Sequence, residues 1–138
     1  AALTEDPIQV MFSGRFLRMR SLADTLRSLP VASRISLAIT EYESRDFSLV
    51  DVNRRGCTKG TTVTAWAAQR GLGRHEIMAI GDNLNDRDML EAAGTPVVMG
   101  NAVEALKQTG WFVTGSNDEA GVAAAIHRFA LGPAKPAV

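Results

Sequence analysis

The chain has 138 residues, of which 46% are apolar and 22% charged, as is usual for a soluble globular protein, either one compact domain or a piece of a larger one. Its 15 basic residues balance 15 acidic ones, so the charge gives no indication of a nucleic-acid partner. The single cysteine, Cys57, excludes an internal disulfide and suits a cytoplasmic protein, and no apolar run approaches the roughly 20 residues that a membrane span needs.

The first fifty residues alternate between strand-like and helix-like patterns. Residues 8–12 are apolar and predict a strand. Residues 15–29 repeat apolar side chains at three- and four-residue steps, which predicts an amphipathic helix that ends before Pro30. Residues 35–40 and 47–52 predict two further strands joined by a polar hairpin connection. The order is β-α-β-β, and we expect an antiparallel sheet.

From about residue 59 the pattern changes to a regular alternation of helices and strands. Helices are predicted at 61–70, directly after Lys59-Gly60, and at 85–93, 102–108 and 119–131, and strands at 77–80, 96–99 and 111–114. The run at 77–80 is entirely apolar, which is typical of a strand buried on both faces of a parallel sheet. Such alternation predicts βαβ units and an α/β fold. We therefore expect one unit over residues 1–53, a second over 54–131, and a disordered tail over 132–138.

One motif stands where an α/β protein carries its chemistry. Gly81-Asp82-Asn83-Leu84-Asn85-Asp86 directly follows the apolar strand at 77–80. Ligands of open α/β sheets bind at the carboxyl ends of the strands. Carboxylates at that place suit Mg²⁺, which proteins hold with one or two carboxylates plus waters and substrate phosphate. Asn85 can donate a hydrogen bond to a phosphate oxygen.

A purely structural interpretation of the same residues exists. Asn85 is a favoured N-cap, and Asp88, three residues later, would complete a capping box. Asp82 would then be a turn residue. The sequence around the motif favours the metal interpretation.

Several further blocks, taken in order, resemble the haloacid dehalogenase (HAD) superfamily, and within it the Cof-type phosphatases with a large α/β cap. Cys57-Thr58-Lys59-Gly60 resembles the family's Ser-Lys-Gly block, and Gly81 to Leu90 resembles its Gly-Asp-x-x-Asn-Asp-x-x-Met-Leu block. Val97 to Ala102 and Ser116 to Val122 resemble its Val-Ala-Met-Gly-Asn-Ala and Asn-Asp-Glu-Asp-Gly-Val blocks. The resemblance implies that residues 54–131 are the C-terminal half of a Rossmann-like core with a parallel sheet. Residues 1–53 would be a partial cap.

The resemblance also implies roles for four residues. Asp82 matches the carboxylate that ligates Mg²⁺. Asp86 matches the second acid of the block, a candidate metal ligand that is more often a support. Asn85 matches a phosphate contact, and Lys59 matches the lysine that neutralises the phosphate and the attacking carboxylate. The implied substrate is a small phosphorylated metabolite, with sugar phosphates among the candidates.

One part of the family's site is not found in the sequence. The family's nucleophile lies in an Asp-x-Asp-Gly-Thr segment after its first strand, whereas the only Asp-x-Asp here is Asp86-Arg87-Asp88. We therefore expect a fragment of a longer enzyme that has no phosphatase turnover alone. Exposed sheet edges would favour a homo-oligomer.

Two other functions stay open on the sequence. The chain could be a non-catalytic binding or assembly domain of the same fold, which the missing nucleophile favours and the intact Lys59, Asp82, Asn85 and Asp86 oppose. The phosphorylation domain of a cation-pumping ATPase has a similar Gly-Asp-Gly-x-Asn-Asp block. The Met-Gly-Asn-Ala block and the lack of membrane spans argue against that assignment.

Overall fold

The computed structural model describes residues 7–132, which form two compact units that divide between Thr58 and Lys59. The strand that closes the first unit runs to Arg54, beyond the predicted residue 52, and the Arg55 backbone N–H donates to the Arg34 carbonyl oxygen at 2.9 Å. The first unit therefore extends beyond residue 53, where the sequence predicted that it would end. The predicted tail over 133–138 lies outside the described residues.

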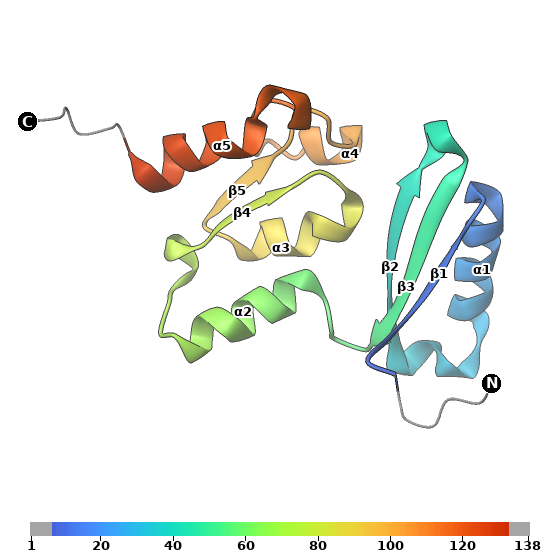
Figure 1. The fold of residues 1–138 in the computed structure, drawn as a ribbon. Coiled ribbons are helices and arrows are strands. Elements are labelled where there is room, and N and C mark those ends of the chain that lie inside the picture. The colour runs from blue at the N-terminus through green and yellow to red at the C-terminus, as the bar shows by residue number, and fades with distance from the viewer. Residues whose placement is uncertain (1–6, 133–138) are drawn as a thin grey trace, which may run out of the picture. The chain divides into compact units, whose positions relative to one another are not determined.

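The first unit is a three-stranded antiparallel sheet with one long helix (Figure 1). Its order is β1-β3-β2, so β3 is central and pairs Val50 with Phe12 on one side and with Ile39 on the other. Val50 is fully buried, as is Ala23 of the helix that packs on the sheet. The elements are β1 (Gln9–Gly14), α1 (Phe16–Ser28), β2 (Ile35–Tyr42) and β3 (Phe47–Arg54), with 3₁₀ turns at Pro30–Arg34 and Glu43–Arg45. The predicted β-α-β-β order and the antiparallel pairing are confirmed.

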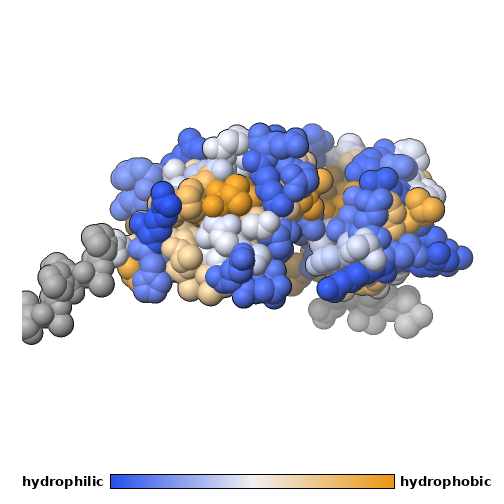
Figure 2. Space-filling view, turned by 90° about the horizontal axis from the view of Figure 1, so that it is seen from above, coloured by the Kyte–Doolittle hydropathy of each residue, from blue (hydrophilic) through white to orange (hydrophobic). Residues whose placement is uncertain are grey.

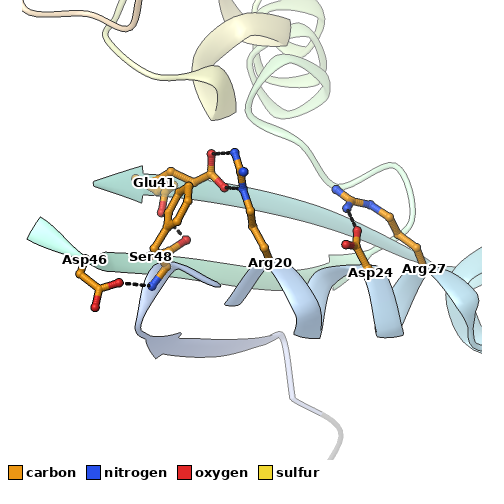
Figure 3. Close-up of polar contacts among 8 residues, drawn as sticks. Arg20, Asp24, Arg27, Glu41, Asp46 and Ser48 are labelled. Carbon is orange, nitrogen blue, oxygen red and sulfur yellow. Dashed lines mark hydrogen bonds and ion pairs between the residues drawn. The ribbon is translucent and has the colours of Figure 1, made fainter. Parts of the chain in front are cut away.

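Polar contacts fix the helix and the hairpin of this unit (Figure 3). Arg20 of α1 donates to Glu41 of β2 at 2.9 Å, and Arg15 pairs with Asp46 at 2.6 Å. Asp46 has a positive φ of 46°, which closes the hairpin after the 3₁₀ turn. The buried hydroxyl of Ser48 donates to the Thr40 carbonyl oxygen at 3.0 Å, so its burial leaves no unpaired polar group.

The second unit is a parallel sheet of order β4-β5-β6 covered by helices. Figure 1 shows α2 and α3 on one side of β4 and β5, and α4 and α5 on the other. Within the core, Leu90, Val98 and Leu106 are fully buried. The elements are α2 (Lys59–Gln69), β4 (Met78–Gly81), α3 (Arg87–Ala92), β5 (Thr95–Val98), α4 (Glu104–Lys107), β6 (Phe112–Val113) and α5 (Gly121–Ile126), with 3₁₀ turns at Arg74–Glu76, Leu84–Asp86 and Asn117–Glu119. The predicted alternation and parallel sheet are confirmed.

Three predicted helices of this unit were too long. The helix predicted at 85–93 begins at Arg87 after a 3₁₀ turn, and the one at 102–108 has only four residues. The helix predicted at 119–131 is broken at Ala120, which has a φ of 55°, because Gly121 packs directly on the Gly115 carbonyl. A π-helical turn at His127–Leu131 follows α5. The strand β4 is also less buried than predicted, since Met78 and Ile80 are only half-buried.

Apolar side chains remain exposed on both units. Apolar residues gather on the face seen in Figure 2, and α5 with the following turn exposes Val122, Ile126 and Phe129. In the first unit Met11 of β1 is 61% exposed. Across residues 7–132, no helix has the length and apolarity required to cross a membrane.

Candidate functional site

Two backbone hydrogen bonds hold the start of the loop after β4. Met99 donates its N–H to the Gly81 carbonyl oxygen at 2.9 Å, and Val103 donates to the Asp82 carbonyl oxygen at 3.0 Å. A Cβ atom at Gly81 would lie 2.5 Å from Cβ of Asp86, so only glycine allows this approach. Asp82 therefore has a fixed backbone at the carboxyl end of β4, with its side chain open to solvent.

Asp86 is the centre of the hydrogen-bond network in this loop. Its side chain is almost fully buried, and Oδ2 accepts from the backbone N–H groups of Asp82 at 3.0 Å and Asn83 at 3.2 Å. Its Oδ1 accepts from the Lys59 ammonium. Both oxygens are thus engaged, and one carboxylate fixes the turn after β4 and binds the cation of α2.

Lys59 and Gly60, the first two residues of α2, contact α3 at two points. Lys59 donates to Asp86, which is the N-cap residue of α3, and the Gly60 N–H donates to Oδ2 of Asp88 at 3.1 Å. A Cβ atom on Gly60 would overlap the Asp88 carbonyl. The first turns of the two helices therefore touch at their backbones.

The predicted capping role of Asn85 and Asp88 is wrong. The N-cap position of the turn at Leu84–Asp86 belongs to Asn83, and Asp86 completes that capping box. Asp88 directs one oxygen to Gly60 on another helix and the other to the Met89 N–H at 2.9 Å. Asn85 lies half-buried within the same turn as Asp86.

The two carboxylates of the loop have opposite electrostatic environments. Partial burial and the neighbouring charge of Asp86 raise the pKa of Asp82, with Lys59 opposing the rise. Burial alone would raise the pKa of Asp86 as well, but the hydrogen bonds from Lys59 and from the backbone of Asp82 and Asn83 outweigh it and lower the pKa. Hydrogen bonds and Lys59 therefore compensate the negative charge of Asp86 more fully than that of Asp82. A cation bound beside Asp82 would stabilise its charged form.

The third and fourth of the blocks singled out in the sequence, Val97 to Ala102 and Ser116 to Val122, meet at a neighbouring turn. Gly100 donates its N–H to the Gly115 carbonyl at 3.0 Å, and the Asn117 N–H donates to Oδ1 of Asn101 at 2.9 Å. Ser116 donates from both its N–H and its hydroxyl to Glu119 at 2.9 Å. These residues shape the turn that follows β5.

The sequence model of the haloacid dehalogenase-like hydrolases matches residues 2–126, which is most of the chain. The chain belongs to this family. Pyridoxal phosphate phosphatase YbhA of Escherichia coli is 44% identical over 78 residues, which cover 56% of this chain and 29% of that protein. Stress response protein YhaX of Bacillus subtilis is 34% identical over 124 residues, and the match covers 76% of this chain and 43% of that protein.

Solved structures of HAD proteins share the fold. The phosphatase BT1666 of Bacteroides thetaiotaomicron superposes with a TM-score of 0.69 at 31% identity, and the alignment covers 91% of this chain and 42% of that one. A haloacid dehalogenase-like hydrolase from the same organism superposes with a TM-score of 0.68 at 28% identity, and the alignment covers 86% of this chain and 42% of that one. The HAD chain described here thus spans less than half the length of these relatives.

The HAD chain offers one exposed carboxylate at this site, Asp82, beside the buried Asp86 and the Lys59 ammonium, and a carboxylate at this place suits Mg²⁺. Among residues 7–132, no group of three or more His, Cys, Asp or Glu side chains is arranged to hold a metal. Mg²⁺ does not need such a group, since one or two carboxylates with waters and a substrate phosphate suffice. The sequence predicted Lys59, Asp82, Asn85 and Asp86. The contact between Gly60 and Asp88 was missed, because no sequence signal links a glycine to an acid 28 residues away.

Proposed function

We propose that this chain carries part of the site of a Mg²⁺-dependent phosphatase that acts on small phosphorylated metabolites, with sugar phosphates among the candidates. One observation carries the proposal: Lys59 and Asp86 lie in contact beside Asp82 at the carboxyl end of β4. Phosphoryl transfer requires a cation and fixed positive donors around an anionic group, and this arrangement supplies the positions for both.

The contacts support a division of roles between the acids. Both oxygens of Asp86 are engaged within the chain, which suits a support that orients the loop and holds Lys59. The exposed Asp82, whose pKa is raised, is the better candidate for the metal ligand. Bound Mg²⁺ would supply electrostatic stabilisation of the phosphoryl oxygens. Lys59 would neutralise a phosphate oxygen, and Asn85 would donate a hydrogen bond to it.

The nucleophile of the proposed aspartyl-phosphate comes, in this proposal, from residues outside these 138. Asp86 is buried and engaged, and Asp88 bonds Gly60, so neither acid of the Asp-x-Asp on α3 is placed to attack phosphorus. Attack on phosphorus needs an accessible carboxylate. The chain alone is therefore expected to bind Mg²⁺ and phosphate and to release no p-nitrophenol from p-nitrophenyl phosphate.

The direct test is an NMR titration of the ¹⁵N-labelled chain, first with MgCl₂ and then with inorganic phosphate. Mg²⁺ is expected to move the amide signals of residues 81–86, and phosphate to move Lys59 only when Mg²⁺ is present. Asp82→Asn should remove both effects, whereas Glu104→Asn, an exposed acid of α4, should leave them. Signals that do not respond to Mg²⁺ would refute the metal site. Robust Mg²⁺-dependent turnover that Asp82→Ala abolishes would refute the external nucleophile.

A non-catalytic binding or assembly domain is the second candidate, and the absence of a usable Asp-x-Asp favours it. The same titration separates the two candidates. A domain that has lost the chemistry has no requirement for Mg²⁺ or phosphate, so neither should bind at residues 81–86.

A further inference from the structure

Asp88 stands outside the roles that the site assigns, yet it contacts the helix that carries Lys59. Its Oδ2 accepts the Gly60 N–H at 3.1 Å, and its Oδ1 accepts the Met89 N–H of its own helix at 2.9 Å. A carboxylate interacts favourably with the N-terminus of its own helix without contacting another helix. Asp88, in contrast, uses one of its two oxygens to bond α2.

Two adjacent residues of α2 bond two acids at the start of α3, its N-cap residue Asp86 and Asp88 two positions later. Lys59 bonds Asp86 and Gly60 bonds Asp88. The second contact is between a backbone N–H and a partly buried side chain, so it fixes the helix itself and not only a side chain. The Lys59 side chain is 49% exposed and has many rotamers available to it. Its ammonium stays at Asp86 only if its backbone is held at the right distance.

The glycine at position 60 makes this contact possible. A Cβ atom there would overlap the Asp88 carbonyl and lie 3.1 Å from Oδ2 of Asp88. Gly60 and Asp88 thus form a close contact between the first turns of α2 and α3.

We propose that Asp88 is a positioning residue: by accepting the Gly60 N–H it fixes the start of α2 and so holds the Lys59 ammonium against Asp86. The contact itself is independent of the proposed function. Only its consequence for phosphate binding rests on that function.

The chain offers a simple readout, because it has only three lysines. The ¹H–¹⁵N spectrum of the lysine ammonium groups can report Lys59 directly. Lys107, which pairs with Glu104 at 2.8 Å, is an internal control within the same unit. In Asp88→Ala, the Lys59 ammonium signal is expected to move toward that of a free lysine while Lys107 stays unchanged. Hydrogen exchange of the Gly60 amide should accelerate about two- to tenfold, the ratio that corresponds to one ordinary hydrogen bond.

Two matched variants separate positioning from a general effect on the fold. Glu91→Ala removes another acid of α3, which pairs only with Arg87 at the surface, and should leave Lys59 and Gly60 unchanged. Asp88→Asn keeps a side-chain oxygen for the Gly60 N–H and should restore most of the Lys59 signal. If Asp88→Ala does not fold, Gly60→Ala provides the same test from the side of α2, since its Cβ forces the two helices apart.

A Lys59 signal that is identical in wild type and Asp88→Ala would overturn the proposal, as would an equal change in Glu91→Ala. Affinity for inorganic phosphate with Mg²⁺ is measured in parallel and is expected to fall in Asp88→Ala but not in Glu91→Ala. If wild type binds no phosphate, the proposed function fails, whereas the Lys59 and Gly60 signals still decide whether Asp88 positions Lys59.

Discussion

Replacing Asp86 with alanine should destabilise the second unit strongly, because this one buried carboxylate serves three donors. The backbone N–H groups of Asp82 and Asn83 donate at 3.0 and 3.2 Å, and the third donor is Lys59. Hydrogen bonds to a charged group contribute about 1.5–3 kcal/mol each when buried. The bond from Lys59 counts for about 1 kcal/mol or less, since the lysine is half exposed. Because water can reach Asp82 and replace part of the lost bonding, we expect a total loss of about 2–4 kcal/mol.

Urea unfolding followed by tryptophan fluorescence measures this loss. Both tryptophans, Trp66 and Trp111, lie in the second unit, so the signal reports that unit alone. With a denaturant slope of about 1 kcal/mol/M for a unit of this size, the midpoint should fall by about 2 M or more. Asp86→Asn keeps an oxygen acceptor and should lose about half as much.

The matched control is Glu104→Ala, in the same unit. Glu104 forms an exposed pair with Lys107, and such pairs contribute about 0.5 kcal/mol or less. A loss for Asp86→Ala within about 0.5 kcal/mol of this control would show that the three contacts do not stabilise the loop, and the reasoning would fail.

Four other expectations follow from the structure. Asp82→Asn should stabilise the second unit slightly at neutral pH, by about 0.5 kcal/mol or less, because it removes a charge that partial burial and Asp86 disfavour but that water screens at this exposed side chain, and the gain should disappear when MgCl₂ stabilises the wild type. Because folding lowers the pKa of Asp86, its contribution to the free energy of unfolding is complete above the unfolded value of about 4 and is lost as the pH falls through the folded pKa. Acid unfolding of Asp82→Asn should show this loss without the opposing effect of the Asp82 carboxyl. Asp86→Asn should show a flatter dependence of stability on pH. Gly81→Ala should cost about 1–3 kcal/mol in the same urea assay, because its Cβ would lie 2.5 Å from that of Asp86, and an unchanged midpoint would contradict the packing. The edge strands β1 and β4 should promote self-association in light scattering, and a monodisperse monomer would count against it.

The sequence by itself determined the fold class and indicated candidate residues for the site. Apolar strand runs, helix runs of period near 3.6 and an apolar strand before Gly81 are local properties, and local patterns are what a sequence displays. Lys59 and Asp82 could be singled out from the blocks in which they occur. The approximate place of Asp82, at the carboxyl end of a parallel strand, follows from the topology of such sheets.

Tertiary structure decided what each acid does. Apart from the family resemblance, Asp86 and Asp88 look alike in the sequence, since both are acids at the start of one predicted helix. Because α2 packs on α3, Asp86 accepts hydrogen bonds from Lys59 and from the turn after β4, whereas Asp88 accepts one from the Gly60 N–H. The same holds for the last helix, where the close approach of Gly121 to Gly115 breaks a run that local periodicity predicts to be continuous. Contacts between residues far apart in the chain depend on where whole elements pack, and no local pattern carries that information.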